Sequence, residues 1–323
     1  MKSVLVYKSP QVRVVEGANV GDELTFAREL FLDDTYMLEP LARRERLSVR
    51  FETDGLFVGK KGEVGQSGQR LYVDCCVTFM SERGQTAEAL VLVEVNDDEF
   101  AVAVYLMPLS KLDAKTRYTL IGVDSEKAPE KFAHTACVFF ARGTRITLST
   151  GMLKPIEELN AGDEILTRDA GVQEIRWIGQ VTMRASGAFA PVLMKAGALS
   201  NVNDLVLGPE HRLFIYQRSD ELGTGRSETL VRVRHLVNGN DVIRIEAGYI
   251  DYYQILFDEH QFIYAEGIPV ESQLLDQHSL LALPKEAQTG LKDHDTIYST
   301  LEVSEDILKT PNALELLRKA TGR

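Results

Sequence analysis

The 323-residue sequence has few of the features that mark several broad classes of protein. It contains three cysteines, of which Cys75 and Cys76 are adjacent, so it cannot form the disulfide framework of a small secreted domain. Asp and Glu number 48 against 36 Lys and Arg, and the net charge of −12 argues against a nucleic-acid partner, which requires a basic face. Tryptophan occurs once, at Trp177, which we expect to lie in a core.

Long apolar runs and metal-binding motifs are also missing. The longest apolar runs, such as residues 100–109, are too short to span a membrane, and residues 1–7 are too short for a signal-peptide core. No CxxC, HExxH or calcium-loop pattern occurs, so we expect no metal site and no cofactor. Cysteine usage fits a reducing compartment. The sequence therefore predicts a cytoplasmic protein without a transmembrane segment, with non-classical export as the alternative.

What the sequence does contain is a long series of short strand patterns. Residues 47–53 alternate between apolar and polar, and Asp54-Gly55 then supplies a hairpin turn. Further strands at short spacing make residues 1–123 a predicted small β-sandwich or barrel, with helical spacing only at 23–32 and 38–45. No polar residues converge in this region, so it does not indicate a chemistry.

A polar, proline-bearing stretch at 124–136 is the predicted linker to a second region. Residues 137–272 again predict strands, with one short helical turn at 153–159 and a turn held by the Asp163 side chain. From 273 to 323 the pattern becomes helical, most clearly at 310–321. We expect this tail to dock as a cap; a partner-binding helix is the alternative.

Cys137 lies where the linker ends and the second region begins. A single cysteine is more often a small buried hydrophobe than a nucleophile, and Cys75 and Cys76 are expected to be core residues of that kind. Cys137 differs because it opens a strand at a domain junction, before two aromatic residues and a Gly-Thr turn. Its role therefore depends on which motifs follow it.

Four motifs follow in a fixed order: CVFFARGT (137–144), KPIEEL with AGDEILT (154–159 and 161–167), LGPEHRLF (207–214) and DEHQFIYAEGIPV (258–270). In this order they resemble the blocks of the Hint family, the β-fold shared by inteins and the Hedgehog autoprocessing domain, and most of all its stand-alone bacterial branch. The resemblance implies an all-β, horseshoe-like domain with pseudo-two-fold symmetry over residues 137–272.

The resemblance also implies a chemistry. The thiol of Cys137 would attack the carbonyl of Ala136 in an N-to-S acyl shift, giving a thioester, with His211 delivering the proton to the departing amide nitrogen. The family has a threonine three residues before this histidine, where the present sequence has Gly208, whose backbone N–H would have to hold the oxyanion instead. His260 falls on a histidine of the last block and is either a supporting residue or a turn residue.

The end of the last motif departs from inteins, which finish in His-Asn. Glu271-Ser272 stands here, and neither residue can perform the asparagine cyclisation that completes splicing. The resemblance therefore implies single-turnover, cysteine-dependent self-cleavage without splicing. The N-terminal domain would be the intramolecular substrate, and water or a small nucleophile would resolve the thioester.

Two alternatives remain open from the sequence. The second domain is either this autoprocessing module or a degenerate Hint module that serves as a structural or protein-interaction domain; a Cys-His hydrolase acting on other substrates is the less favoured third reading. The remaining histidines match no motif and are expected to be ordinary: His134, His235, His278 and His294. Deleting residues 273–323 is expected to change the cleavage rate, or solubility alone if the tail is only a cap.

Overall fold

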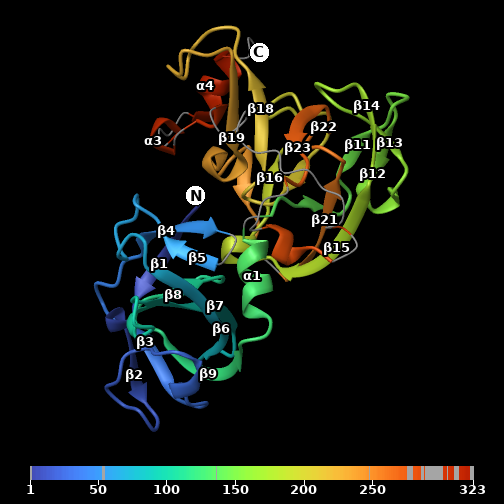
Figure 1. The fold of residues 1–323 in the computed structure, drawn as a ribbon. Coiled ribbons are helices and arrows are strands. Elements are labelled where there is room, and N and C mark those ends of the chain that lie inside the picture. The colour runs from blue at the N-terminus through green and yellow to red at the C-terminus, as the bar shows by residue number, and fades with distance from the viewer. Residues whose placement is uncertain are drawn as a thin grey trace. The chain divides into compact units, whose positions relative to one another are not determined.

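The fold is seen in a computed structural model of the chain, coloured by residue number in Figure 1. The structure describes residues 2–52, 55–135, 137–246, 248–274, 279–284, 287, 301–303, 305–308 and 313–320. The chain divides into two compact units, Met1–Thr135 and Ala136–Arg323. The predicted class, mainly β with a short helical tail, is confirmed.

The first unit is organised by a closed barrel of six strands in the order β6-β5-β4-β1-β8-β7, which closes through the pairing of β6 with β7. Strands β9, β3 and β2 continue the sheet outward from β6. The strands are β1 (Lys2–Lys8), β2 (Val12–Glu16), β3 (Thr35–Leu38), β4 (Glu45–Glu52), β5 (Gly55–Val58), β6 (Arg70–Ser81), β7 (Thr86–Val95), β8 (Ala101–Pro108) and β9 (Arg117–Asp124). The barrel is one of the two architectures predicted for this region.

The core of the first unit shows why these residues form strands. Cys75, Val77 and Phe79 alternate along β6 and are all buried in one cluster, as the period of two along a strand requires. The Phe79 ring meets the ring of Tyr36 edge to face at 5.6 Å. Cys75 and Cys76 are both buried, so their assignment as core residues is confirmed.

The two stretches with helical spacing do not form α-helices. Within 23–32 the structure has one 3-10 turn, η2 (Ala27–Glu29), and another, η1 (Ser9–Gln11), lies earlier in the chain. The N–H of Leu24 donates to the carbonyl of Val12 at 2.8 Å, and its side chain enters the core. Pairing with a distant segment outweighs local helical spacing here, which is a common outcome because propensity is a weak influence.

The stretch predicted as a linker contains the helix α1 (Ala128–His134), which belongs to the first unit. Pro129 lies in its first turn, where a missing N–H costs nothing. The Phe132 ring stacks on Phe51 with centroids 6.2 Å apart, and Lys131 donates to Glu88 at 2.5 Å. These contacts fix α1 to the barrel. Ala136 lies outside the described residues.

The second unit is formed by two six-stranded sheets and a two-stranded one, β13-β14. One large sheet has the order β15-β21-β10-β17-β16-β20 and the other the order β12-β11-β22-β23-β18-β19. The strands are β10 (Phe140–Ala141), β11 (Arg145–Thr147), β12 (Leu153–Pro155), β13 (Glu164–Leu166), β14 (Val172–Glu174), β15 (Trp177–Arg184), β16 (Val192–Met194), β17 (Leu205–Leu207), β18 (Arg212–Tyr216), β19 (Glu228–Arg232), β20 (Val242–Arg244), β21 (Tyr249–Leu256), β22 (Phe262–Ala265) and β23 (Ile268–Glu271). Its 3-10 turns are η3 (Ile156–Glu158), η4 (Gly187–Phe189), η5 (Val233–Leu236) and η6 (Ser279–Ala282).

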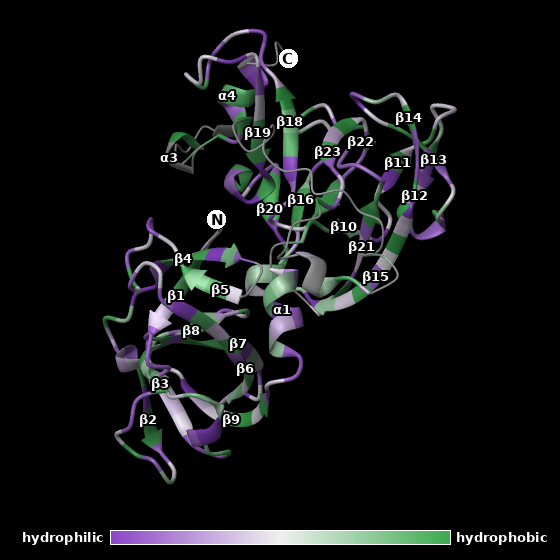
Figure 2. Cartoon of the chain, viewed as in Figure 1, coloured by the Kyte–Doolittle hydropathy of each residue, from purple (hydrophilic) through white to green (hydrophobic). Residues whose placement is uncertain are grey.

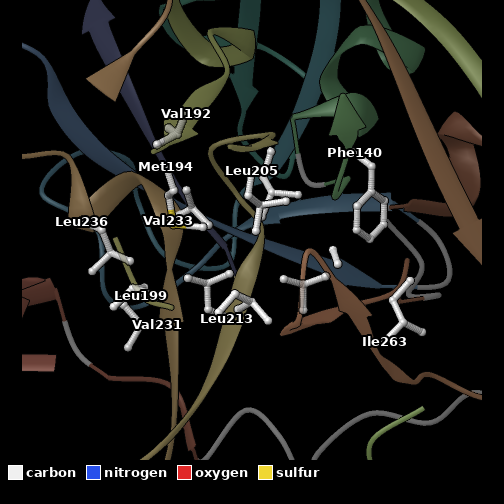
Figure 3. Packing of buried hydrophobic residues seen from close by; sticks show 14 of the residues in the cluster. Phe140, Val192, Met194, Leu199, Leu205, Leu213, Val231, Val233, Leu236 and Ile263 are labelled. Atoms are coloured by element: carbon white, nitrogen blue, oxygen red, sulfur yellow. The ribbon is translucent and has the colours of Figure 1, made fainter. Parts of the chain in front are cut away.

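A single large apolar cluster holds these sheets together. Figure 3 shows Phe140, Leu205, Leu213 and Ile263, from four different strands, among its buried side chains. Figure 2 colours the whole chain by hydropathy: β18, which contributes to this cluster, is mainly hydrophobic, and the connecting loops are mainly hydrophilic. Phe140 joins this cluster directly, so the start of the unit is anchored in its core.

The C-terminal helices α3 (Glu305–Leu308) and α4 (Ala313–Ala320) pack on this same core. Leu314 and Leu317 of α4 are buried in the cluster, and Arg318 donates to the carbonyl of Ala198 at 2.8 Å. The predicted docked helix is therefore confirmed for the described part of the tail. Among the described residues no helix has the length and apolar character that crossing a membrane would need.

Candidate functional site

Cys137 lies just before β10, with its side chain in a small apolar cluster. Phe139, Ala141 and Tyr252 share this cluster, whereas Phe140 points the other way, into the large core. This alternation is that of an extended strand. The thiol-bearing residue is 2% exposed. The structure thus places Cys137 at the start of the unit in an enclosed, apolar environment.

His211 lies on the Phe140 side of the same segment. It is fully buried between β17 and β18, and its ring meets the ring of Phe140 edge to face with centroids 4.4 Å apart. The backbone of Phe139 also hydrogen-bonds the imidazole. Phe139 is two residues from Cys137, a reach of at most about 7 Å along a chain. The imidazole therefore faces the backbone of the segment that Cys137 begins.

Two backbone groups meet the imidazole of His211. Nε2 lies 3.2 Å from the carbonyl oxygen of Glu271, and the backbone of Phe139 also hydrogen-bonds the ring. Burial lowers the pKa of His211 to about 4, despite the opposing effects of Glu271 and of these two backbone groups. At neutral pH the residue is a neutral imidazole, which has one protonated nitrogen and one that can accept a proton.

The buried His211 gives the second unit a defined response to acid. The unfolded chain binds a proton near pH 6.5, whereas the folded chain does not bind it until about pH 4. The free energy of unfolding therefore decreases as the pH falls from about 6.5 toward 4. The decrease between pH 7 and pH 5 is about 2 kcal/mol. Urea unfolding followed by Trp177 fluorescence measures it, because the only tryptophan lies in the second unit. His211→Gln should remove the difference between the two pH values; a variant that keeps it would contradict the assignment.

Glu271, the residue whose carbonyl meets His211, forms a buried ion pair with Arg212. The Arg212 N–H and Nε each donate to the carboxylate at 2.7 Å, and Nη2 lies 2.6 Å from it. Burial by itself raises the pKa of Glu271, but the charge of Arg212 outweighs it and lowers the pKa to about 2. The carboxylate is therefore ionised throughout the neutral range. This pair fixes the end of β23 against the start of β18.

His260 lies on the other side of the same carboxylate. Its Nε2 is 3.7 Å from Oε2 of Glu271, and its ring meets the Phe262 ring edge to face at 5.3 Å. His260 contributes to lowering the pKa of Glu271. Both histidines named from the sequence are thus brought to one residue, Glu271, one at its carbonyl and one at its carboxylate.

Gly208 has a role other than the one expected for it. Its N–H donates to the carbonyl of Phe139 at 2.7 Å, so this donor is engaged in joining β17 to the strand segment before β10. A Cβ at this position would lie 3.1 Å from Cβ of Phe139 and 3.4 Å from its backbone nitrogen and oxygen. The close approach of two backbones explains the glycine, and an oxyanion donor here would first have to release this hydrogen bond.

Introducing the threonine that the family has at this position is therefore expected to destabilise the second unit. Gly208→Thr should lower its free energy of unfolding by about 1–3 kcal/mol, because the extra atoms must push β17 and Phe139 apart. Urea unfolding followed by Trp177 fluorescence measures the change. Gly208→Ala should show a smaller loss in the same direction. A threonine variant as stable as the natural chain would show that the backbones separate freely.

The tail reaches the same ion-pair network. The N–H of Val303 donates to the carbonyl of Leu230 at 2.9 Å, extending the edge at β19, and Leu301 packs against the cluster of Phe214, Leu230 and Phe262. Between them, Glu302 lies 3.7 Å from Nη1 of Arg212 and binds Arg232. Arg232 in turn pairs with Glu210 at 2.8 Å. The tail therefore contributes a charge to the residues around the candidate site.

The other residues named from the sequence have simpler outcomes. The Asp163 carboxylate accepts from the N–H of Asn160 at 3.0 Å and from Lys154 at 2.8 Å, so its predicted part in the turn is confirmed. His134 is buried in α1, and His235 lies in η5. His278, His294 and Ala136 lie outside the described residues. Among described residues no group of three or more potential ligands could hold a metal ion.

Sequence reasoning missed Arg212, the ion-pairing role of Glu271, and Gln273. Gln273 is 4% exposed, and its Oε1 accepts from the N–H of Val138 at 3.0 Å. Arg212 lies in the third motif, directly after the histidine, whereas Glu271 and Gln273 lie beyond the last motif. The available signal was a charged residue next to a candidate catalytic histidine, because an arginine that becomes buried needs a carboxylate partner.

Comparison with known families shows that residues 137–277, which begin at Cys137, match the Hint domain family. The match ends five residues beyond the predicted boundary at 272.

Solved structures similar to the chain include two inteins. The M86 variant of the Ssp DnaB mini-intein has 11% identity and a TM-score of 0.29, covering 43% of this chain and 97% of its own. The gp41-1 intein has 10% identity and a TM-score of 0.26, covering 42% of this chain and 98% of its own. No curated protein matches the chain.

Proposed function

We propose that the Hint domain cleaves its own chain between Ala136 and Cys137 by an N-to-S acyl shift, without splicing. One observation carries the proposal. A fully buried, neutral His211 meets the Phe140 ring edge to face and hydrogen-bonds the backbone of Phe139, two residues from Cys137. A titratable group whose pKa is shifted by burial, beside a candidate nucleophile, is typical of a catalytic site. Proton transfer at the neighbouring amide is the role that this placement supports.

The reaction needs one proton to move from sulfur to nitrogen. Once the Cys137 side chain has turned from its apolar cluster to the side of the imidazole, His211 takes the proton of the thiol. The sulfur then attacks the carbonyl carbon of Ala136 through a five-membered ring. As the carbon–nitrogen bond breaks, the imidazolium returns the proton to the nitrogen of Cys137. The products are a thioester and a free α-amine, and a positioned acid or base of this kind contributes about 10²–10⁴-fold. A water molecule or small nucleophile then releases the first unit as an acid or its derivative.

Because the pKa of His211 is lowered to about 4, its catalytic role differs from the one that the resemblance implied. The sequence resemblance implied an acid, but an imidazole with this pKa is unprotonated at neutral pH. It has to act first as a base and only then as an acid, which suits a step in which thiol and amide exchange one proton. The chemistry of a neutral imidazole supports this order, because one of its two nitrogens is unprotonated and can accept the thiol proton.

The absence of splicing is proposed from the residues at the end of β23. Ser272 is fully buried, and its hydroxyl accepts from the N–H of Gln261 at 3.0 Å. The Glu271 carboxylate accepts a hydrogen bond from Arg212. Neither side chain carries the amide that would cyclise and release a downstream segment, so the reaction ends at cleavage before Cys137.

Intact mass spectrometry of the purified full-length chain tests the proposal. Samples are kept at neutral pH alone, with a thiol, and with hydroxylamine, which attacks thioesters. We expect hydroxylamine to give two fragments that meet between Ala136 and Cys137, the first ending in a hydroxamate. A chain that stays whole under all three conditions would overturn the proposal.

One observation favours a second candidate, a non-catalytic Hint module that serves in structure or interaction. Cys137 is 2% exposed among apolar side chains, and cysteines buried in this way are usually inert. This reading predicts that no condition cleaves the chain and that Cys137→Ala leaves its mass and its oligomeric state unchanged. The enclosed thiol also disfavours a hydrolase acting on foreign peptides, which would need an open cleft.

A further inference from the structure

The segment that follows the last motif returns to the start of the domain. Gln273 lies three residues beyond that motif, and its Oε1 accepts from the backbone N–H of Val138, the residue after Cys137. The two residues are 135 positions apart in the chain. The side-chain amide therefore joins the segment after β23 to the residue beside the candidate nucleophile.

The Gln273 amide is held rigidly on all sides. Besides Val138, its Oε1 accepts from Nε2 of Gln254 at 3.1 Å, and its own Nε2 donates to the carbonyl of Leu274 at 2.7 Å. Its backbone N–H donates to the carbonyl of Ile255 at 3.0 Å. Gln254, which is 4% exposed, lies in β21, the strand that pairs with β10. With its oxygen bonded twice and the whole side chain buried, the amide has one available orientation.

We infer that Gln273 is a positioning residue for Cys137, an inference that rests on the proposed self-cleavage. The N–H of Val138 belongs to the peptide group that follows Cys137. Fixing that group sets the rotation on the carboxyl side of Cys137 and so the place of its Cα. The nucleophile then reaches the Ala136 carbonyl through χ1 and φ of Cys137, the two rotations used in forming the five-membered ring, since the peptide bond itself is planar. Gln273 touches no reacting atom, and it acts through the backbone of Cys137.

This role suits glutamine and few other side chains. The position requires an acceptor for two N–H donors and a donor toward Leu274, within an enclosed space. A neutral amide provides all three without a buried charge. Because geometry near a reacting group has steep effects, a misplacement of about 1 Å costs about 10²-fold in rate. Losing the acceptor is therefore expected to slow formation of the thioester by about 10- to 100-fold.

The test compares full-length chains carrying Gln273→Met, Gln273→Glu or Gln217→Met. Methionine keeps the length of the side chain and removes the acceptor, whereas glutamate keeps the acceptor. Gln217 is a matched control: it is 3% exposed in the same unit and bonds to Thr224 and Arg226, far along the chain from Cys137. The readouts are the rate of hydroxylamine cleavage, the Tm, and amide hydrogen exchange at Val138.

The expected result is a 10- to 100-fold loss of rate in Gln273→Met, a smaller loss in Gln273→Glu, and faster exchange at Val138 only in the position-273 variants. Gln217→Met should match the Tm loss of Gln273→Met with little change in rate. Equal rate losses in both methionine variants would overturn the inference, because the effect would then follow stability alone. If hydroxylamine never cleaves the natural chain, the proposed function is refuted, and the positioning role of Gln273 is refuted with it. Hydrogen exchange at Val138 would still show separately whether its hydrogen bond to Gln273 exists.

Discussion

Replacing Cys137 with alanine is expected to leave the chain whole under every condition that cleaves the natural protein. The thiol is the only nucleophile placed to form a five-membered ring with the carbonyl of Ala136, so its removal closes the path. Where a nucleophile is deleted, enzymes that use one lose about 10⁴-fold or more in rate. Hydroxylamine cleavage of the purified chain, followed by intact mass over several days, measures the loss.

Two further variants make this result specific. Cys76→Ala removes another buried cysteine, from the first unit, and should cleave at the natural rate. His211→Gln should retain the thiol and lose about 10²–10⁴-fold, the usual contribution of a positioned proton-transfer group. Cleavage at 136–137 in the Cys137→Ala chain would exclude the thioester path, and an unchanged rate in His211→Gln would remove the imidazole from the mechanism.

The second large effect is expected from Glu271→Ala, which should lower the free energy of unfolding of the second unit by about 3–5 kcal/mol. The reason is the partner that remains. Arg212, whose side chain is 10% exposed, would keep its charge without the carboxylate that receives three of its contacts. Removing one member of a buried ion pair costs this much because the other stays buried and uncompensated. Glu302, at 3.7 Å from Arg212, can compensate only in part.

Urea unfolding followed by Trp177 fluorescence measures this loss, with two comparisons. Asp258→Ala removes an ion pair with Arg176 in which the aspartate side chain is 87% exposed, and it should cost less than about 1 kcal/mol. The double variant Arg212→Met with Glu271→Leu should regain most of the stability, since apolar residues of similar size can replace a buried pair. A loss below about 1 kcal/mol for Glu271→Ala would mean that Arg212 reaches solvent when released.

The stability and the chemistry of the second unit meet at Glu271. Its carboxylate pairs with Arg212, and its carbonyl oxygen lies 3.2 Å from Nε2 of His211. Glu271 therefore has two separable roles, one through its side chain and one through its backbone. Glu271→Gln should keep the carbonyl contact while weakening the ion pair, so its effect on unfolding should exceed its effect on cleavage.

Some of this could be read from the sequence because the signals are local. Period-two alternation identified the strands, since neighbouring side chains along a strand face opposite sides. The helix at 313–320 followed from Leu314 and Leu317 at helical spacing. The same reasoning failed at 23–32, where Leu24 pairs with Val12 and local spacing had no influence on the result. It also passed over α1, whose helix depends on packing Phe132 against Phe51.

The sequence by itself determined that the protein is rich in β-strands, that its second half carries the ordered motifs of a Hint domain, and that Cys137 opens that domain. Only the tertiary structure decided what surrounds these residues: the pKa of His211, the pairing of Glu271 with Arg212, and the hydrogen bond from Val138 to Gln273. The physical reason is sequence separation. Alternation and spacing act between neighbours, whereas burial and hydrogen-bond partners are set by strands that meet from opposite ends of the domain.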